Sequence, residues 1–295
     1  MIQKSCNWSG GTLHYKIYGE GQPLILLHGF GEDSSIWNRQ VAFLQHHCQL
    51  IIPDLPGTGN SFWSIVNGEW LMSKGLLLEA TKEQQTNSRL TSHVSPVTPS
   101  INDLADSIYH LLIQENISSC YLLGHSMGGY ITLAFAEKFP LMLKGFGLIH
   151  STAFADSEEK KKNRMRGIEL MEQYGGYSFL KTTIPNLFGE AFKKINPEAV
   201  EQLIEQAAGL STPSLQAYYY AMMNRPDRTE VLKSNPLPVL FVMGTEDVAA
   251  PLNDVLQQTH LPLISYIHIL DGVGHMGMWE STERLNELLI SFIHQ

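Results

Sequence analysis

The sequence predicts an α/β fold in which a parallel sheet is flanked by helices and interrupted by a helical cap. Three observations support this prediction. Short, continuous apolar runs recur along the chain, helical patterns separate them, and one long stretch is helical throughout. A run that is apolar at every position is typical of a strand buried on both faces of a parallel sheet. Strands that alternate with helices form such sheets through right-handed crossovers.

The first predicted strands lie close together near the start of the chain. Residues 13–18 alternate between apolar and polar side chains, and a glycine-rich turn separates them from the continuous apolar run at residues 23–27. Alternation indicates a strand with one buried face, whereas the continuous run indicates burial on both faces. Further runs predict strands at residues 50–52, 121–123, 146–149, 239–242 and 264–270.

Two segments carry the clearest helical patterns of the predicted sheet region. Residues 100–115 place apolar side chains on one face, with Ser100 as the expected N-cap and Asp103 in the first turn. Both residue types favour a helix N-terminus. The second helix is expected from Met127 to Phe139, because Pro140 cannot continue it.

Two segments interrupt the alternation of strands and helices. Residues 151–232 contain helical patterns only, broken by Gly175-Gly176, Pro185, Pro197 and Pro213. We interpret this segment as a cap inserted into a core formed by residues 1–150 and 233–295. Residues 62–98 begin with aromatic and apolar side chains and then become polar. Because long structureless loops are uncommon in compact domains, we expect a partly helical insertion followed by a mobile linker.

Composition limits the class of protein. The chain has 295 residues, of which 43% are hydrophobic and 17% are charged, so it can bury a sizeable core and is not disordered. Its formal charge is −9, and its one compact basic run, at residues 160–162, directly follows two glutamates. A nucleic-acid-binding protein usually gathers a basic face. We therefore expect a small-molecule substrate, no nucleic acid, and a monomer or homodimer.

The three cysteines indicate packing rather than chemistry. Cys6, Cys48 and Cys120 are far apart in the sequence and odd in number, so they form neither a metal motif nor a disulfide framework. The first residues lack the apolar segment of a secretory signal, and no apolar stretch approaches the roughly 18 residues of a membrane span. These patterns predict a cytoplasmic protein without membrane contact.

The strongest chemical signal is Gly124-His125-Ser126-Met127-Gly128-Gly129, which follows a predicted strand and opens a predicted helix. This G-x-S-x-G context defines a nucleophile elbow, a sharp turn that holds a serine in a strained backbone conformation. The glycines prevent side chains from colliding around the turn. We expect Ser126 to be a nucleophile at the carboxyl edge of the sheet.

A serine hydroxyl needs a base, and the base needs an acid that orients it. His275 follows the last predicted strand, on a loop at the same edge as Ser126. Asp247 follows the strand at residues 239–242, with Glu246 as its nearest competitor. The side chains of a tight loop cannot be assigned to faces from sequence, but Asp247 is favoured. The chain order is then serine, aspartate, histidine.

Acyl transfer also requires an oxyanion hole, in which each amide donor stabilises the transition state by about 3 kcal/mol. The Met127 amide directly follows the nucleophile and is the first expected donor. The second is expected from the loop His28-Gly29-Phe30-Gly31, where two glycines allow close backbone approach to a ligand. We assign this role to the Phe30 amide. No metal and no organic cofactor is required by such a site.

The chain resembles the α/β-hydrolase fold superfamily. The resemblance rests on motifs spread over nearly the whole chain in the expected order, namely residues 28–31, Asp54-Leu55-Pro56-Gly57-Thr58-Gly59-Asn60-Ser61, residues 124–129, Gly244-Thr245-Glu246-Asp247 and Gly274-His275. It implies a mostly parallel eight-stranded sheet with a helical lid after the sixth strand. It also implies catalytic roles for Ser126, Asp247 and His275, and a structural rather than catalytic role for His28. The length of residues 62–98 departs from the family pattern.

The substrate is less defined than the chemistry. The cap is rich in aromatic residues and methionine, which favours an apolar ester of small to medium size. His125, Phe30, Tyr218 and Met222 are the expected substrate contacts. The cap arginines could bind a carboxylate, although surface positions are favoured for each. They are Arg164, Arg166, Arg225 and Arg228.

Three functions remain open from the sequence. The first is a carboxylic ester hydrolase that acts through an acyl-enzyme. The second uses the same triad as a carbon–carbon bond hydrolase or lyase on an acidic dienol-type metabolite. A buried cap arginine facing Ser126 would favour it. The third is a small-molecule receptor in which hydrolysis is vestigial, which an intact triad disfavours.

Overall fold

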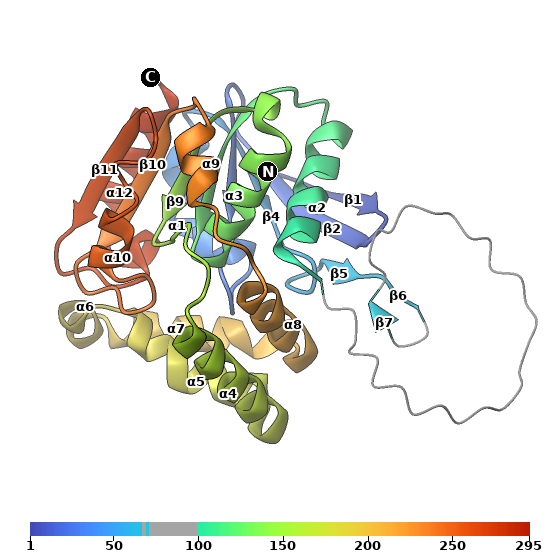
Figure 1. The fold of residues 1–295 in the computed structure, drawn as a ribbon, viewed down its shortest axis with the longest axis vertical. Helices are drawn as coiled ribbons and strands as arrows, with labels where there is room; N and C mark the ends of the chain where they lie inside the picture. The colour runs from blue at the N-terminus through green and yellow to red at the C-terminus, as the bar shows by residue number, and fades with distance from the viewer. Residues whose placement is uncertain (67–68, 71–98) are drawn as a thin grey trace, which may run out of the picture.

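The main sheet has nine strands in the computed structural model, which describes residues 1–66, 69–70 and 99–295 (Figure 1). Eight strands lie in the order β1-β2-β4-β3-β8-β9-β10-β11, and the short β5 pairs with β2 outside this path. Their bounds are β1 (Ile2–Trp8), β2 (Gly11–Tyr18), β3 (Pro23–Leu27), β4 (Gln49–Pro53), β5 (Phe62–Trp63), β8 (Cys120–His125), β9 (Leu143–Ile149), β10 (Val239–Gly244) and β11 (Ser265–Leu270). The predicted strands are all present, whereas β1 and β5 were not expected from the sequence pattern.

The sheet is parallel from β4 to β11, and β2 runs antiparallel to both β1 and β4. The apolar run of β3 is explained by its two buried faces. Leu24 and Leu26 point into one hydrophobic core, and Ile25 and Leu27 point into the other. Because side chains alternate along a strand, a strand covered on both faces must be apolar at every position.

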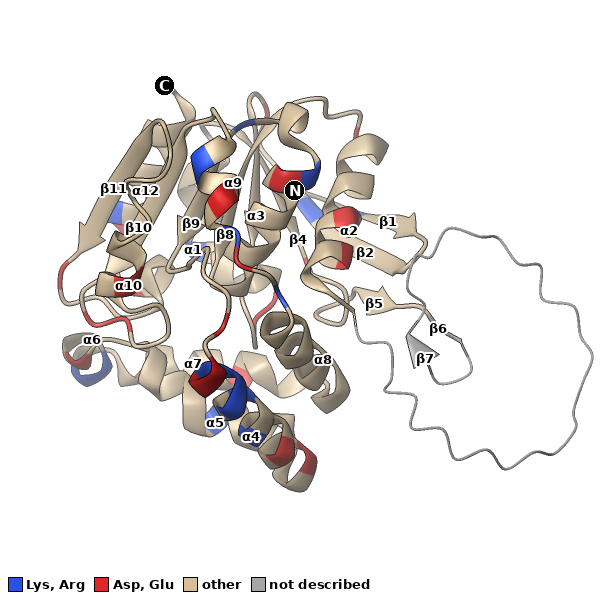
Figure 2. Ribbon diagram, viewed as in Figure 1, with Lys and Arg blue, Asp and Glu red and all other residues tan. Residues whose placement is uncertain are grey.

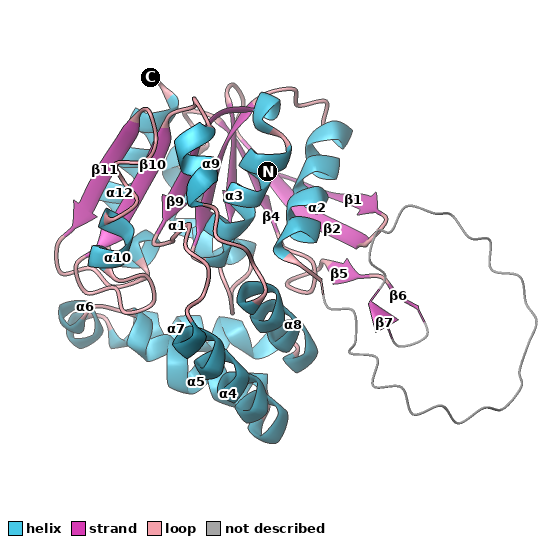
Figure 3. Ribbon diagram, viewed as in Figure 1, coloured by secondary structure: helices cyan, strands magenta, loops and turns pink. Residues whose placement is uncertain are grey.

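Helices cover both faces of this sheet (Figure 3). α2 (Ile101–Gln114) and α3 (Met127–Lys138) pack on each other, and α1 (Asn38–Leu44) packs on α12 (Thr282–Ile293). The predicted N-cap is confirmed, because Ser100 and Asp103 form a reciprocal capping box at the start of α2. The remaining helices of the core region are α9 (Thr229–Ser234), α10 (Leu252–Leu256) and α11 (Gly277–Glu280).

Five of the six α-helices between β9 and β10 form a separate layer beyond one edge of the sheet, and this layer is the cap (Figures 1 and 3). They are α4 (Glu158–Tyr174), α5 (Gly176–Thr183), α6 (Glu190–Ile195), α7 (Pro197–Gln206) and α8 (Thr212–Met223). The predicted breaks fall at helix ends: Gly175 separates α4 from α5, and Pro197 is the first residue of α7. Acidic and basic residues are mixed along the cap helices (Figure 2).

The described part of the insertion differs from the prediction. Trp63 of β5 is buried beside Trp8, with 6.1 Å between the ring centroids. Next, β6 (Ile65–Val66) and β7 (Glu69–Trp70) pair as a small antiparallel sheet. These residues are therefore strands and not the expected helix. The rest of the prediction for residues 62–98 lies outside the described residues.

Two further observations concern predictions made from composition. The cysteines at positions 6, 48 and 120 are buried and form no disulfide, and burial raises the pKa of the Cys120 thiol to about 12. This fits a packing role. Within the described ranges, no helix has both the length and the apolar character needed to cross a membrane.

Candidate active site

Ser126 lies on the turn between β8 and α3, with φ 52° and ψ −116°. Positive φ is uncommon for a residue with a side chain and indicates local strain. The surrounding glycines explain how the turn is accommodated. A Cβ added at Gly124 would lie 2.1 Å from the carbonyl carbon of Gly128, and a Cβ at Gly128 would lie 2.7 Å from the Leu27 oxygen. Only glycine fits at either position.

His275 and Asp247 form a buried pair at the same edge. His275 Nδ1 lies 2.9 Å from Asp247 Oδ1 and 2.8 Å from Oδ2, so it donates to the carboxylate. Asp247 Oδ1 also accepts from the backbone amides of Ala249 and Ala250, at 2.9 and 2.8 Å. These bonds fix the carboxylate and hold the imidazole in one tautomer, with Nε2 free to act as a base.

The pair shifts the pKa of both members. Burial acts to lower the pKa of His275, but the Asp247 charge and its hydrogen bond outweigh burial and raise that pKa above its usual value near 6.5. Burial acts to raise the pKa of Asp247, whereas His275 and the hydrogen-bonding His150 hold it well below its usual range. Asp247 therefore stays ionised and stabilises the charged form of His275.

Glu246, the competing acid, lies outside this arrangement. Its side chain is exposed and accepts from the Glu190 amide at 2.7 Å. It therefore tethers α6 of the cap to the loop after β10. The geometry leaves Asp247 as the acid that orients His275.

Ser126 and His275 line one cavity of about 130 Å³ between the sheet edge and the cap. A buried water occupies roughly 10–15 Å³ on the same measure, so the cavity has room for a small organic molecule. Both the core and the cap contribute to its wall. The other lining residues are Phe30, Glu32, Tyr130, Arg164, Leu180, Thr183, Ile184, Leu187, Tyr219, Met222, Ala249 and Ala250.

The two expected oxyanion donors lie next to Ser126. Met127 is the first residue of α3, where backbone amides have no partner within the helix. Phe30 lines the cavity, and the loop that carries it is close to the serine, because a Cβ at Gly29 would lie 3.0 Å from Ser126 Cβ. His28 donates from Nδ1 to the Gly29 carbonyl at 2.8 Å and accepts the Leu55 amide at Nε2 at 3.0 Å.

His125 does not line the cavity, in contrast to its expected role as a substrate contact. It is fully buried, with Nε2 donating to the His275 carbonyl at 2.9 Å and Nδ1 pairing with Glu32 at 3.1 Å. Glu32 in turn accepts the Gly29 amide at 2.6 Å. This chain of bonds links the Phe30 loop to the backbone of His275. A side chain with these bonds positions its neighbours rather than binding substrate.

Sequence reasoning missed Glu32 altogether. Its carboxylate is buried and lines the cavity. Burial acts to raise its pKa, but His125 and the Gly29 amide outweigh burial and lower it. Glu32 is thus an ionised group held by specific donors, and its neighbour Asp33 instead caps the following helical turn.

His150 was also missed. It follows β9 directly, has φ 50°, and donates from Nδ1 to Asp247 Oδ2 at 3.0 Å. Burial lowers the pKa of His150 more than Asp247 raises it, so the imidazole stays neutral. Together His150, Asp247 and His275 offer donor atoms within 4.8 Å of one another, a spacing that could hold a metal ion. The hydrogen bonds to Asp247 already engage both Nδ1 atoms.

The expected cap contacts separate into two groups. Met222 lines the cavity, as expected, whereas Tyr218 is fully buried and donates to the Pro56 carbonyl at 2.7 Å. The expectation that Tyr218 contacts substrate is therefore wrong, and the described cap tyrosine that lines the cavity is its neighbour Tyr219. The Tyr219 ring lies 4.4 Å from the Phe30 ring. Adjacent residues on a helix are rotated by about 100° about the helix axis, so the side chains of Tyr218 and Tyr219 point in different directions.

The cap arginines also differ from expectation. Arg166 is exposed, as favoured, but Arg225 and Arg228 are buried, and Arg164 lines the cavity. Arg225 lies 3.8 Å above the Tyr130 ring and pairs with Asp156 at 2.8 Å. Arg228 pairs with Glu137 at 3.0 Å. Arg225 and Arg228 lie in the loop between α8 and α9, and the sequence of that loop does not reveal that both side chains are buried and paired.

Known proteins resemble this chain over its full length. A hydrolase of (E)-2-((N-methylformamido)methylene)succinate from Acinetobacter baylyi is 23% identical and covers 99% of this chain and 98% of its own. A 2-hydroxy-6-oxononadienedioate/2-hydroxy-6-oxononatrienedioate hydrolase from Paraburkholderia phymatum is 26% identical and covers 97% and 93%. The solved structure of a thermophilic esterase from Thermogutta terrifontis shares the fold, with a TM-score of 0.83, 24% identity and coverage of 100% and 98%.

The model of one protein family spans most of the chain. It matches residues 24–288, which include β3 with its glycine loop, the turn at Ser126, and the loops that carry Asp247 and His275. The sheet order, the inserted cap and this match agree, and the chain belongs to the alpha/beta hydrolase family of enzymes.

Proposed function

We propose that the protein hydrolyses carboxylic esters of small to medium size through Ser126, His275 and Asp247. One observation carries the proposal: a serine on a strained strand-to-helix turn shares a cavity with a histidine that a buried aspartate orients. This arrangement supplies a nucleophile, a base and an orienting acid for acyl transfer.

The reaction follows from these groups. Ser126 Oγ attacks the ester carbonyl carbon while His275 Nε2 takes its proton. The Met127 and Phe30 amides stabilise the negative charge on the carbonyl oxygen, and His275 then protonates the leaving alcohol. Water, deprotonated by the same histidine, hydrolyses the acyl-enzyme and restores Ser126. The leucine, isoleucine and aromatic side chains of the cavity favour an apolar substrate body.

A carbon–carbon bond hydrolase is the second candidate. The observation that favours it is Arg164, a cap cation in the wall of the Ser126 cavity. The Paraburkholderia phymatum relative is named as a hydrolase of dienedioates and trienedioates, which are dicarboxylic substrates of the class that this candidate would take. The two candidates share the triad and differ in the bond that is broken.

A fluorophosphonate probe tests the nucleophile. Wild-type protein should be labelled, Ser126→Ala should not, and Ser178→Ala, which alters an exposed cap serine, should be labelled like the wild type. The same three proteins are then assayed on 4-nitrophenyl acetate, 4-nitrophenyl butyrate and a dienol ketone. Serine-dependent ester cleavage supports the first candidate, and cleavage of the ketone alone supports the second. Buffer-level rates on every substrate, without labelling, would contradict both candidates and leave a receptor with a vestigial site.

A further inference from the structure

The cavity that contains Ser126 has opposite charges in its wall. Glu32 belongs to the loop that carries Phe30, and Arg164 belongs to α4 of the cap. The carboxylate of Glu32 is already engaged by the Gly29 amide and by His125. Among the described residues that line the cavity, Arg164 is the one lysine or arginine. A negatively charged substrate group is therefore repelled on the Glu32 side and attracted on the Arg164 side.

Arg164 belongs to a cluster with an unbalanced charge. Asp156 is fully buried and pairs with two arginines, Arg164 Nε at 2.5 Å and Arg225 Nη1 at 2.8 Å. Two guanidinium groups share one carboxylate, so the cluster keeps one positive charge. Burying a charge without compensation is costly, and a bound anion would supply the compensation.

The two arginines differ in what they leave free. Arg225 also donates to the Met222 and Phe154 carbonyls at 2.7 and 2.9 Å, and its side chain is 2% exposed. Arg164 is 19% exposed and lines the cavity. A guanidinium has five N–H donors in a planar fork, and the Asp156 bond uses one of them. Arg225 thus holds the cluster in place, and Arg164 presents its charge to the cavity.

Aromatic contacts join this cation to the catalytic edge. Arg164 lies over the Tyr219 ring, 5.1 Å from its centroid, and the Tyr219 ring contacts the Phe30 ring at a tilt of 31°. Phe30 stands beside the nucleophile in the loop after β3. The guanidinium is therefore linked through two ring contacts to the residue that carries the expected oxyanion donor, and all three residues line the same cavity.

From this geometry we propose that the cavity recognises a carboxylate at the end of the substrate remote from the scissile bond, and that Arg164 binds it. A carboxylate carries one negative charge, which matches the one uncompensated positive charge of the cluster, and it fits the guanidinium fork. The inference rests on the proposed hydrolysis and narrows its substrates to monoesters of dicarboxylic acids or acidic ketones.

Matched esters test this assignment. The anionic 4-nitrophenyl monoester of adipic acid and its uncharged methyl ester differ in charge and little in length. With spontaneous hydrolysis subtracted, kcat/KM should favour the anion in the wild type. Arg164→Gln should lower the ratio of anion to uncharged ester by about tenfold to a hundredfold, the range for a hydrogen bond to a charged group. Arg164→Lys should recover part of the ratio, and Arg166→Gln, on the exposed face of α4, should leave it unchanged.

Binding separates this assignment from the proposed hydrolysis. In Ser126→Ala protein, calorimetry should detect monomethyl adipate, and the added Arg164→Gln change should weaken that binding by a similar factor. Ester cleavage without any preference for the anion, or binding that ignores Arg164, would overturn the carboxylate site and leave the hydrolase standing. Binding that depends on Arg164, without cleavage that depends on Ser126, would support the carboxylate site and contradict the proposed hydrolysis. The monoesters of pimelic and suberic acid then measure the spacing between the two ends.

Discussion

The sheet edge and the cap contribute to the same cavity in different ways. At the edge, the position of each important group is set by backbone: Ser126 by a turn that admits only glycine at Gly124 and Gly128, and Asp247 by amide donors from its own loop. In the cap, the groups that face the cavity are single side chains on helices, such as Arg164 on α4 and Tyr219 on α8. The comparison indicates that the reaction is built into loop geometry, whereas substrate choice depends on helix orientation.

Replacing the acid at the sheet edge, Asp247, should have the largest effect on kcat. Asp247→Asn removes the charge that orients and stabilises His275, and kcat should fall by about 10⁴-fold. Glu246→Gln, which changes the adjacent acid, should leave kcat near the wild-type value. Steady-state kinetics on 4-nitrophenyl butyrate measures both. Equal losses in the two variants would contradict the assignment of Asp247.

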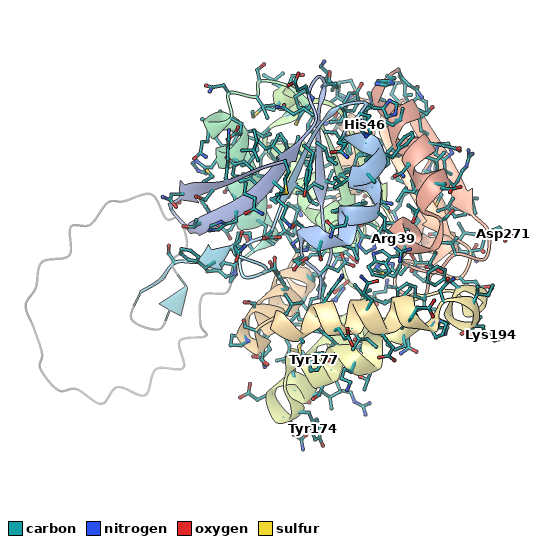
Figure 4. The ribbon with its side chains drawn as sticks, turned by 180° about the vertical axis from the view of Figure 1, so that it is seen from behind. Arg39, His46, Tyr174, Tyr177, Lys194 and Asp271 are labelled. Atoms are coloured by element: carbon teal, nitrogen blue, oxygen red, sulfur yellow. The ribbon has the colours of Figure 1, made fainter. Side chains whose placement is uncertain are left out.

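The buried link between Glu32, His125 and His275 should have an intermediate effect. His125→Phe removes the donor to the His275 carbonyl, and kcat should fall by about tenfold to a hundredfold with little change in KM, since the link positions groups and does not touch substrate. His46→Gln, at the end of the molecule far from the cap in Figure 4, is the matched control. A rise in KM with unchanged kcat would instead favour a substrate contact.

The pH dependence sharpens the description of the edge. His275 must be neutral to accept a proton, so kcat/KM should rise with pH through its raised pKa, above 6.5. Stability should change in the opposite direction. Because the folded-state pKa of His275 is higher than its unfolded one, protonated His275 contributes its full stability below pH 6.5 and loses it as pH rises through the folded-state pKa. The lowered pKa of Asp247 means that its own contribution is lost only in acid, below the unfolded value of 3.8. Activity profiles and urea unfolding across this range measure the two trends, and parallel trends would argue against the His275–Asp247 pair as their source.

Substitutions of two adjacent cap tyrosines should have the smallest effects on stability and on KM. Tyr218→Phe removes a buried hydrogen bond to Pro56 and should lower the free energy of unfolding by about 1 kcal/mol, with kcat/KM unchanged. Tyr219→Ala removes a ring from the cavity and should raise KM by about two- to tenfold. Urea unfolding and ester kinetics measure both variants. A change in KM for Tyr218→Phe, with none for Tyr219→Ala, would contradict the assignment of the two roles.

The sequence predicted much of the sheet and its edge for a physical reason. Strands buried on both faces must be apolar throughout, and a tight turn demands glycine, so β3, β8 and Ser126 are visible as local patterns. His150 was missed although it follows a predicted strand, because its role depends on β9 lying between β8 and β10. That neighbourhood is a property of the assembled sheet.

The cap was less predictable because helical rotation decides which side chain faces the cavity. Three consecutive tyrosines, at positions 218–220, point in different directions, and nothing in their order identifies Tyr219 as the one that lines the wall. The arginines were unpredictable for a related reason, because Asp156, the partner of Arg164, lies in the loop before α4, and Glu137, the partner of Arg228, lies in α3. Tyr174, labelled at the outer end of the cap in Figure 4, is 60% exposed although the sequence gives it the same aromatic character.

The backbone of Ser126 has a consequence for the evolution of this enzyme. A residue with a side chain at φ 52° costs roughly 1–3 kcal/mol, a penalty that glycine avoids. Replacing Ser126, the proposed nucleophile, by glycine should therefore raise the melting temperature while it abolishes turnover. Under the proposed function, a serine at this position exchanges thermal tolerance for reactivity.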